Sequence, residues 1–381
     1  MDVGKYKNIL LIGAEVKPIP SVKGGAVELL VDDILRENEN TKFANITVVS
    51  PFDSNAQSQS STYSNSSFIY IDCNRTIQII HNIIDLFSRK FFKKSTGNYY
   101  IKKILKIIDF SKYDEIIIEN RPLFGIKLRK KYKGKLILHL HNDFINKNSQ
   151  QAKEILDSYD NIIVISNYLK NRILEVQPHN IEVVYNGINL NNFLSLKTYS
   201  NGKKRIIYSG RLVPEKGVLE LIEAFNKIND DDIQLDIIGD FDSNAEDENK
   251  FIEKFYNLIG NNANINYIGF IQHSDIYKYY EEAYIGVVPS IVNEALSLTA
   301  IEMLAAGIPV ICTNSGGLTE VVDQSNGIII SKNNLSDNIY SSIKELINNQ
   351  NERDFLSSNT RSKALFFDLN NYLHNIINYI I

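Results

Sequence analysis

Residues 284 to 317 read YIGVVPSIVNEALSLTAIEMLAAGIPVICTNSGG and place two short apolar runs on either side of a helical pattern. The runs YIGVVPS (284–290) and IPVICT (308–313) carry no charge, as is typical of strands buried on both faces of a sheet. The segment between them ends at Gly307 and Pro309, residue types that terminate helices. This order of strand, helix and strand predicts a parallel sheet.

The same alternation runs through the whole chain. We therefore predict an α/β fold of two doubly wound, parallel-sheet domains, residues 1–190 and 191–363, joined where the polar stretch 189–204 interrupts the pattern. Residues 364–381 predict a C-terminal amphipathic helix, and the Asn- and Ser-rich residues 54–67 predict a surface loop. The further predicted strands are NILLIG (8–13), ITVVS (46–50), FIYID (68–72), EIIIE (115–119), KLILHL (135–140), NIIVIS (161–166), IEVVYNG (181–187), RIIYSG (205–210), IQLDIIG (233–239), INYIGF (265–270) and GIIIS (327–331).

Composition and charge restrict the possible functions. The 381 residues are 44% hydrophobic and 23% charged, without a membrane-length apolar run or a secretory leader, so we expect a cytoplasmic protein. Residues 1–190 hold 26 Lys and Arg against 20 Asp and Glu, whereas the remainder holds 15 against 25. Residues 87–106 interleave cations with aromatic residues, which suits either an anionic membrane surface or a solvated helix face. Nucleic acid is not expected as a partner, because no binding motif is recognisable.

Ligands of open α/β sheets bind at the carboxyl ends of the strands. After the first predicted strand, Gly24 and Gly25 open a helix, which would let backbone amides approach a phosphate, although a plain turn has the same pattern. The Gly-x-Gly-x-x-Gly spacing is missing there, which argues against a nicotinamide dehydrogenase. After the run RIIYSG, Arg211 and Lys216 could hold two phosphates without a metal, or could pair with neighbouring glutamates.

Several of these segments occur together in a known family. The segments that carry the resemblance are the Gly-Gly pair, NGIN (186–189), SGRLVPEKG (209–217) and NEALSLTAIEMLAAGIPV followed by NSGGLTEVV. The chain resembles glycosyltransferase family 4, which has the GT-B fold. The resemblance spans most of the chain and is greatest to bacterial capsule and lipopolysaccharide transferases and related spore-coat proteins. It implies two Rossmann-like domains facing a cleft, with the acceptor on the side of residues 1–190 and the nucleotide sugar in residues 191–363. It also implies that helix 364–381 packs back on the first domain.

The resemblance assigns roles to the acids of the opening segment. Glu294 would bond hydroxyls of the donor sugar, and Glu302 would hold the ribose, since a carboxylate can accept from two hydroxyl donors. The backbone amides of Leu298 and Thr299 would bind the diphosphate at the start of the helix. Two acids on a solvated helix face are the alternative, but the surrounding Ala, Leu and Met leave little polar face. Ser297 stands where the family usually has glycine, and we expect it to narrow the sugar pocket.

The resemblance also implies how the reaction proceeds and which residues take part in it. The family retains the anomeric configuration, and the expected course is a front-face substitution in which Arg211 and Lys216 stabilise the leaving diphosphate. The loop with Gly239 and Asp240 would line the pocket of the nucleotide base. No Asp-x-Asp cluster follows a strand in the matching region in the manner of a metal site, so we predict that no metal is required.

A histidine after the strand KLILHL is a further candidate. In the family a histidine at this place points at the donor sugar and the reaction centre, so we assign His141 a catalytic role. His139 is expected to face the opposite side of the sheet. Glu119, Asn120 and Arg121, which follow the preceding strand, could contact the acceptor.

Taken together, the sequence predicts a retaining glycosyltransferase that uses a nucleotide-diphosphate hexose, preferably a UDP-sugar, and no separate cofactor. The expected acceptor is a glycan, lipid-linked at the inner face of the cell membrane, in the synthesis of a surface polysaccharide. Two alternatives remain open: a GT-B enzyme that acts on a soluble acceptor, and a non-catalytic sugar-nucleotide-binding or coat protein.

Overall fold

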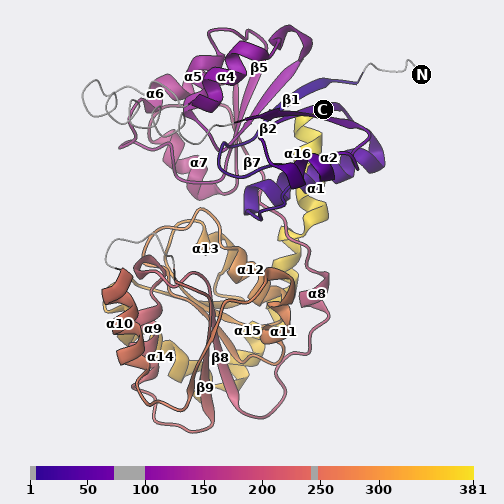
Figure 1. Cartoon of the computed structure of the whole chain (residues 1–381). Coiled ribbons are helices and arrows are strands. Elements are labelled where there is room, and N and C mark those ends of the chain that lie inside the picture. Colours follow the sequence, from indigo (N-terminus) through magenta and orange to yellow (C-terminus); the bar gives the residue numbers. More distant parts are fainter. Residues whose placement is uncertain (1–5, 73–98, 242–247) are drawn as a thin grey trace. The chain divides into compact units, whose positions relative to one another are not determined.

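The computed structural model describes residues 6–72, 99–241 and 248–381 (Figure 1). Its backbone forms two compact units, which consist of Met1–Gly187 with Tyr372–Ile381 and of Ile188–Asn371. Each unit is built on one sheet in which every strand pair is parallel. The predicted α/β fold with two parallel sheets is therefore confirmed.

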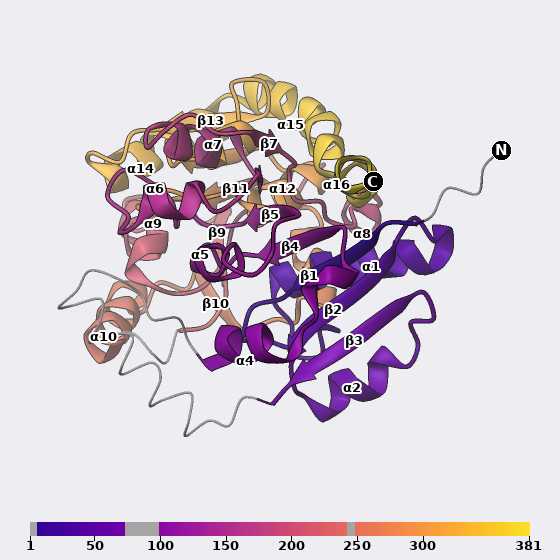
Figure 2. The same cartoon turned by 90° about the horizontal axis from the view of Figure 1, so that it is seen from above.

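Unit 1 contains a seven-stranded sheet in the order β3-β2-β1-β4-β5-β6-β7. Seen from above, β3 is the outermost strand on one side, in agreement with this order (Figure 2). All five residues of β4 are buried, including Glu115 and Glu119 at its two ends, as expected for a central strand. The strands are β1 (Asn8–Ile12), β2 (Asn45–Pro51), β3 (Ser66–Ile71), β4 (Glu115–Glu119), β5 (Lys135–Leu140), β6 (Asn161–Val164) and β7 (Ile181–Val183).

The helices of unit 1 pack their apolar faces on this sheet. In α1 (Ala26–Thr41), Leu30, Val31, Ile34 and Leu35 recur at helical spacing and are all buried. The others are α2 (Ser54–Ser60), α4 (Tyr99–Ile107), η1 (Phe110–Lys112), α5 (Leu123–Leu128), α6 (Ala152–Leu156) and α7 (Asn167–Leu174), and most of α16 (Leu369–Ile380).

The C-terminal helix begins later than the sequence suggests. The segment predicted as one helix from residue 364 consists of a short 3-10 turn, η4 (Leu365–Phe367), followed by α16. Asp368 separates the two because its backbone is extended, and its carboxylate accepts from the Asn370 N–H at 2.9 Å, which starts a new helix. Ile376 and Ile380 of α16 are buried, and Lys7 Nζ donates to the Ile380 carbonyl oxygen at 3.2 Å.

Unit 2 contains a six-stranded sheet in the order β10-β9-β8-β11-β12-β13. The strands are β8 (Lys204–Ser209), β9 (Ile233–Ile238), β10 (Ile265–Gly269), β11 (Ile285–Val288), β12 (Val310–Thr313) and β13 (Gly327–Ile330). The helices are α8 (Asn191–Leu194), η2 (Pro214–Lys216), α9 (Val218–Phe225), α10 (Glu248–Ile259), η3 (His273–Asp275), α11 (Tyr277–Tyr280), α12 (Leu298–Ala305), α13 (Leu318–Val321), α14 (Leu335–Asn348) and α15 (Gln350–Ala364).

Throughout the described residues, the predicted strands correspond to the observed ones, with ends that differ by a few residues. The loop predicted over residues 54–67 is wrong, because residues 54–60 form α2 and β3 already begins at Ser66. Asp53 explains the helix: its carboxylate caps it by accepting from the N–H groups of Asn55 and Ala56. Of the basic segment 87–106, residues 87–98 lie outside the described residues and the rest belongs to α4. No helix among the described residues is long and apolar enough to span a membrane.

Candidate functional site

The carboxyl ends of β8, β11 and β12 in unit 2 bring together residues that lie far apart in the sequence. Lys216 Nζ is 2.5 Å from Glu294 Oε1, and Ser290 Oγ donates to the same oxygen at 2.5 Å. The backbone also fixes Glu294, since its N–H donates to the Ser315 carbonyl and its carbonyl accepts from the Gly317 N–H at 2.7 Å. The structure therefore joins two of the predicted catalytic residues, Lys216 and Glu294, into one ion pair.

The loop that carries Lys216 is held tightly against the loop after β11. Gly217 has a φ of 70°, a left-handed conformation that favours glycine, and a Cβ atom there would lie 2.1 Å from the Pro289 carbonyl oxygen. The Ile291 N–H donates to the Glu215 carbonyl at 2.8 Å. Only glycine therefore permits the close approach that sets the position of Lys216.

The start of α12 is capped by a serine side chain. Ser297 is the N-cap of this helix, and its hydroxyl accepts from the Ala300 N–H at 3.3 Å. Its oxygen therefore stabilises the helix end, a role that glycine would not fill. Leu298 and Thr299, which were predicted to offer backbone amides, form the first turn. An anion at this position would be favoured by the helix dipole.

Glu302 lies about one turn beyond Leu298 in α12. Its hydrogen-bonding partner was not predicted from the sequence. Glu302 is 3% exposed, and its Oε1 is 2.6 Å from His273 Nε2, on η3 after β10. The hydrogen bond to Glu302 is the main cause that raises the pKa of His273. Nothing in the sequence distinguishes this lone histidine from an ordinary surface residue.

A buried tyrosine completes the surroundings of Glu302. The Tyr280 hydroxyl has no hydrogen-bond partner within the described chain. Burial raises the pKa of Tyr280 well above its ordinary value, and the negative charge of Glu302 acts in the same direction. Tyr280 and His273, both from the segment 273–280, therefore lie close to this acid, and His273 is the one that contacts it.

Three other predicted residues lie on neighbouring loops. Arg211 is exposed, two residues past the end of β8, and Asp240 is exposed, two residues past the end of β9. The Leu212 N–H donates to the Asp240 carbonyl at 2.8 Å, which ties these loops together. Gly239 has a φ of 145°, and a Cβ atom on it would lie 1.8 Å from the Gly210 carbonyl oxygen. These contacts place Arg211 and Asp240 at the same edge of the sheet as Lys216.

The glycine pair of unit 1 stands at the start of α1, as predicted. Gly25 is the N-cap residue with a φ of 119°, and Gly24 has a φ of 65°. A Cβ atom on Gly25 would lie 2.1 Å from Glu28 Oε2, so a carboxylate of the chain itself already approaches this helix start. Burial is the main cause that raises the pKa of Glu28. Glu28 was not predicted from the sequence.

The histidines at the end of β5 share one side of the sheet. The expectation that His139 and His141 face opposite sides is wrong, because residues two apart in a strand point the same way. Their ring centroids are 4.1 Å apart, and both rings contact the buried Glu119 at the end of β4. The ring of His141 is thus turned toward Glu119.

These three side chains are of a kind that could hold a metal. One ligand atom from each of Glu119, His139 and His141 lies within 4.8 Å of the others. A metal-bound histidine almost always donates its second N–H to a polar partner. Here His139 Nε2 and His141 Nδ1 find no hydrogen-bond partner within the described chain. The arrangement fits a carboxylate that accepts hydrogen bonds from two rings better than it fits a metal centre.

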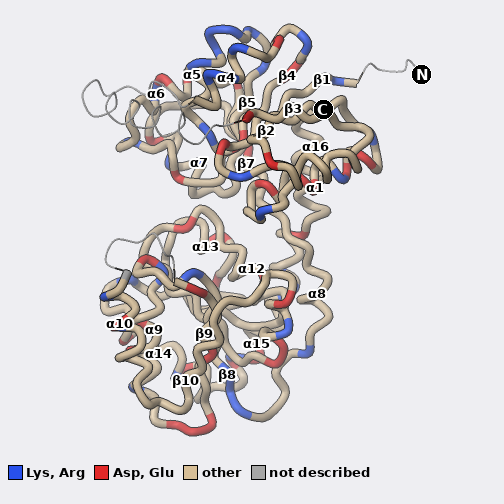
Figure 3. The backbone as a smooth tube through the Cα atoms, in the orientation of Figure 1, with Lys and Arg blue, Asp and Glu red and all other residues tan. Residues whose placement is uncertain are grey.

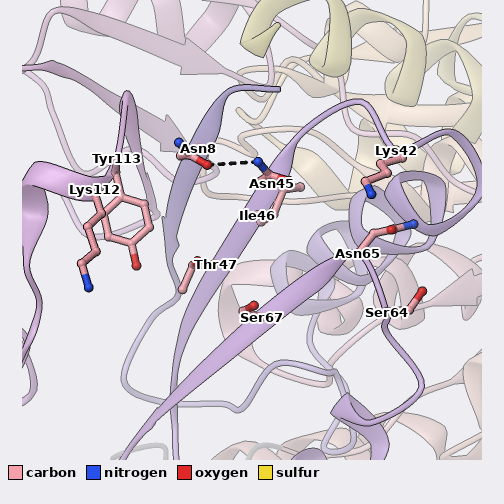
Figure 4. A pocket seen from close by; sticks show the side chains of 10 residues that line it. All are labelled: Asn8, Lys42, Asn45, Ile46, Thr47, Ser64, Asn65, Ser67, Lys112 and Tyr113. Atoms are coloured by element: carbon pink, nitrogen blue, oxygen red, sulfur yellow. Dashed lines mark hydrogen bonds between the residues drawn. The ribbon is translucent and has the colours of Figure 1, made fainter. Parts of the chain in front are cut away.

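A separate hollow lies at the opposite edge of the unit 1 sheet, where the strands begin. Its volume is about 400 Å³, and the Asn45 amide donates to Asn8 Oδ1 at 3.1 Å across it (Figure 4). Ligands of parallel sheets bind at the carboxyl ends of the strands. This hollow is therefore distinct from the candidate site. It is lined by Asn8, Lys42, Asn45, Ile46, Thr47, Ser64, Asn65, Ser67, Lys112 and Tyr113.

Comparisons with known proteins agree with this architecture. Residues 197–363 match the family model described as Glycosyl transferases group 1, and residues 44–192 match the one described as Glycosyltransferase Family 4. The glycosyltransferase MJ1178 of Methanocaldococcus jannaschii is 32% identical over 299 residues, which cover 74% of this chain and 78% of that protein. Lipopolysaccharide 1,2-N-acetylglucosaminetransferase of Salmonella typhimurium is 28% identical over 291 residues, which cover 70% and 72% of the two chains.

A solved structure extends the likeness to the fold of the entire chain. The Anabaena protein HepE, solved in complex with UDP-glucose, has a TM-score of 0.73 at 17% identity and covers 98% of this chain and 99% of its own. Together with the two family models and the match to MJ1178, this confirms the predicted family and the GT-B fold. The chain belongs to glycosyltransferase family 4 and is a sugar-transferring enzyme.

Proposed function

We propose that the protein is a retaining hexosyltransferase that takes a UDP-sugar and extends a glycan, lipid-linked at a membrane surface, in the synthesis of a cell-surface polysaccharide. The observation that carries this proposal is the ion pair of Lys216 and Glu294 at the carboxyl edge of the unit 2 sheet. HepE supports the choice of UDP-sugar, because its solved complexes hold UDP and UDP-glucose. The Salmonella relative, named as a lipopolysaccharide transferase, supports the polysaccharide role.

The two acids divide the recognition of the donor between them. Glu302 is held by His273 through Oε1, so Oε2 is the oxygen that would accept from the ribose hydroxyls. Glu294 is held by Lys216 and Ser290 through Oε1, so its second oxygen would accept from a sugar hydroxyl. In each acid, one oxygen is thus held by the protein, and the other would be the one that accepts from the ligand.

Charge on the leaving group is stabilised by cations rather than by an acid. In the proposed step the acceptor hydroxyl oxygen bonds to the anomeric carbon on the face from which the diphosphate departs. The bond from that carbon to the phosphate oxygen breaks, and the phosphate oxygen takes the hydroxyl proton. Lys216 and Arg211 would stabilise the charge on the diphosphate, each by a few kcal/mol in a site that excludes water. The first-turn amides of Leu298 and Thr299 would add hydrogen bonds to the same group.

The membrane part of the proposal rests on a basic surface of unit 1. Figure 3 shows cationic segments gathered around α4 and α5. Lys131 Nζ donates to the Leu105 carbonyl at 2.7 Å, which joins the end of α4 to the loop before β5. Exposed lysines lie beside the exposed Ile107 in the sequence and in the segment after α5, and each would contribute about 1 kcal/mol near anionic headgroups. These lysines are Lys106, Lys130, Lys131 and Lys133.

Product analysis tests the proposal directly. The protein would be incubated with a panel of UDP-hexoses and a lipid-linked glycan acceptor, followed by release of UDP and by NMR of the new glycosidic bond. A product with the anomeric configuration of the donor is expected. An inverted product contradicts the retaining mechanism, and transfer only to soluble glycans contradicts the lipid-linked acceptor. Absence of any UDP release favours a non-catalytic sugar-nucleotide-binding protein.

Vesicle binding tests the basic surface separately. Replacing Lys106, Lys130, Lys131 and Lys133 with serine should abolish co-sedimentation with anionic vesicles. As a matched control, four exposed lysines of unit 2 would be replaced in the same way, with no expected loss of binding. Equal binding by both variants would remove the membrane from the proposal. The four control lysines are Lys197, Lys203, Lys227 and Lys254.

A further inference from the structure

The carboxyl ends of β4 and β5 in unit 1 hold a buried polar cluster. Glu119 and His139 are each 1% exposed and His141 is 6% exposed. Glu119 Oε2 lies 3.1 Å from His139 Nδ1 and 3.2 Å from His141 Nε2. Asn120 links the same strand ends, because its Oδ1 accepts from the His141 backbone N–H at 3.1 Å and its own N–H donates to the His139 carbonyl at 2.8 Å. The cluster is therefore fixed by both side chains and backbone.

The chemistry of a carboxylate determines which ring nitrogens carry protons. An ionised carboxylate can only accept, so His139 Nδ1 and His141 Nε2 must each present an N–H to it. His139 Nε2 and His141 Nδ1, the nitrogens on the far sides, have no hydrogen-bond partner in the described chain. A neutral imidazole carries a single N–H, so in a neutral His141 ring Nδ1 is the nitrogen that holds the lone pair.

The charge of the cluster agrees with a neutral His141. Burial alone would raise the pKa of Glu119, but hydrogen bonds and charge from the two rings, His139 first, outweigh it and lower the pKa to about 2. Burial is the main cause that lowers the pKa of His141 to about 4, and the charge of His139 adds to it. At neutral pH the carboxylate is thus ionised and the His141 ring is uncharged.

We propose that Glu119 is a positioning residue that fixes the tautomer of His141, so that His141 Nδ1 accepts a hydrogen bond from a sugar hydroxyl. This inference rests on the proposed sugar-transfer function. His139 is the second donor, which keeps the Glu119 carboxylate turned toward His141. Asn186 is buried beside the His141 ring.

The substitution Glu119→Gln tests the tautomer without a change of side-chain size. A glutamine amide can donate an N–H to His141 Nε2, which would move the ring proton to Nδ1 and abolish its acceptor role. Long-range proton–nitrogen NMR of the imidazole rings distinguishes the two tautomers, with His141 assigned from the spectrum of a His141→Asn variant. We expect the Nε2–H form in the native protein and the Nδ1–H form in Glu119→Gln. A native ring in the Nδ1–H form, or the same tautomer in both proteins, would overturn the proposal.

Activity and ligand binding separate this inference from the proposed function. Glu119→Gln should lower kcat by about tenfold or more, as a wrong tautomer does in other enzymes. UDP should still raise the Tm of this variant as it does that of the native protein, since the nucleotide site lies in unit 2. Unchanged kcat would contradict the proposal. Failure of UDP to stabilise even the native protein would count against the proposed function, whereas the NMR result would still decide the tautomer.

A second buried glutamate on the same strand is a matched control. Glu115, at the start of β4, is 4% exposed and contacts Lys7 Nζ at 2.8 Å and Lys135 Nζ at 3.1 Å. Glu115→Gln should lower the Tm without a change in the His141 tautomer or in kcat. An equal effect of the two variants on kcat would show that Glu119 acts only through stability. A stoichiometric bound metal that is lost in Glu119→Gln would also overturn the proposal, because the carboxylate would then be a metal ligand.

Discussion

The substitution Lys216→Met removes the charge that the proposed mechanism needs while it keeps most of the side chain. Lys216 Nζ lies 2.5 Å from Glu294 Oε1, and the two side chains are 25% and 14% exposed. Loss of one partner of a fully buried pair costs about 3–5 kcal/mol, and an exposed pair contributes about 1 kcal/mol or less. For this half-buried pair, with Ser290 still bonded to Glu294, we expect a loss of about 1–2 kcal/mol of unfolding free energy. The Tm should therefore fall by about 2–8 °C.

The catalytic effect should be much larger than the effect on stability. Removal of one group that stabilises transition-state charge lowers kcat by about 10²–10³, which corresponds to about 2.7–4 kcal/mol. The assay measures the rate at which UDP is released while the enzyme consumes a UDP-sugar. The temperature of the assay is kept well below the Tm of the variant. Lys227→Met is the control, because Lys227 pairs with Asp337 at 2.6 Å on the exposed surface of the same unit. If Lys216→Met retained kcat within about threefold, the assignment of Lys216 to the leaving group would be refuted.

Three further outcomes follow from the geometry. Gly217→Ala should cost about 2–4 kcal/mol of unfolding free energy, because its φ of 70° is strained for alanine and its Cβ would lie 2.1 Å from the Pro289 carbonyl oxygen. Gly269→Ala, with a φ of 82° and no atom within 4 Å, should cost only about 1 kcal/mol in the same urea titration. The pKa of His273 is raised by Glu302, so its stabilisation is complete below the ordinary value of 6.5 and is lost as pH rises through the raised value. The Tm difference between the native protein and His273→Asn should therefore shrink from pH 6 to pH 9, and a constant difference would contradict this. The pKa of His141 is lowered to about 4 in the folded protein. As the pH drops from about 6.5 toward 4, His141 takes up a proton in the unfolded chain but not in the folded one, so the unfolding free energy should fall over this range. His141→Asn should flatten that part of the stability curve, and an unchanged slope would refute the assignment.

Much of the fold could be predicted because its strands are buried on both faces. Such strands appear as mostly apolar runs, and EIIIE, the run of β4, coincides with the observed strand at both ends. The helix α2 was missed because serine and asparagine favour loops by propensity, whereas the Asp53 cap overrides that preference locally. The start of α16 was missed for a similar reason, since an extended Asp368 interrupts what is one amphipathic pattern in the sequence.

The candidate site was predictable in its acids and less so in their partners. Glu294 and Glu302 are conspicuous because they interrupt an apolar segment, and the structure gives each of them a hydrogen-bonding partner. Lys216 was identified from its loop, but its pairing with Glu294 depends on two loops that meet only in the folded sheet. His273 has no signal in the sequence, because a single histidine acquires a role only through the acid beside it.

The most direct test of the account is thermal stabilisation of the purified protein by UDP in the presence of EDTA, compared with GDP, dTDP, ADP and CMP. A ligand that binds only the folded state at a hundred times its Kd adds about 2.7 kcal/mol to the unfolding free energy. We predict a rise in Tm of about 5–10 °C with UDP and no metal, which disappears when Arg211 and Lys216 are both replaced by alanine. No rise with any nucleotide, or the same rise in the double variant, would contradict a UDP-sugar site at the carboxyl edge of the unit 2 sheet.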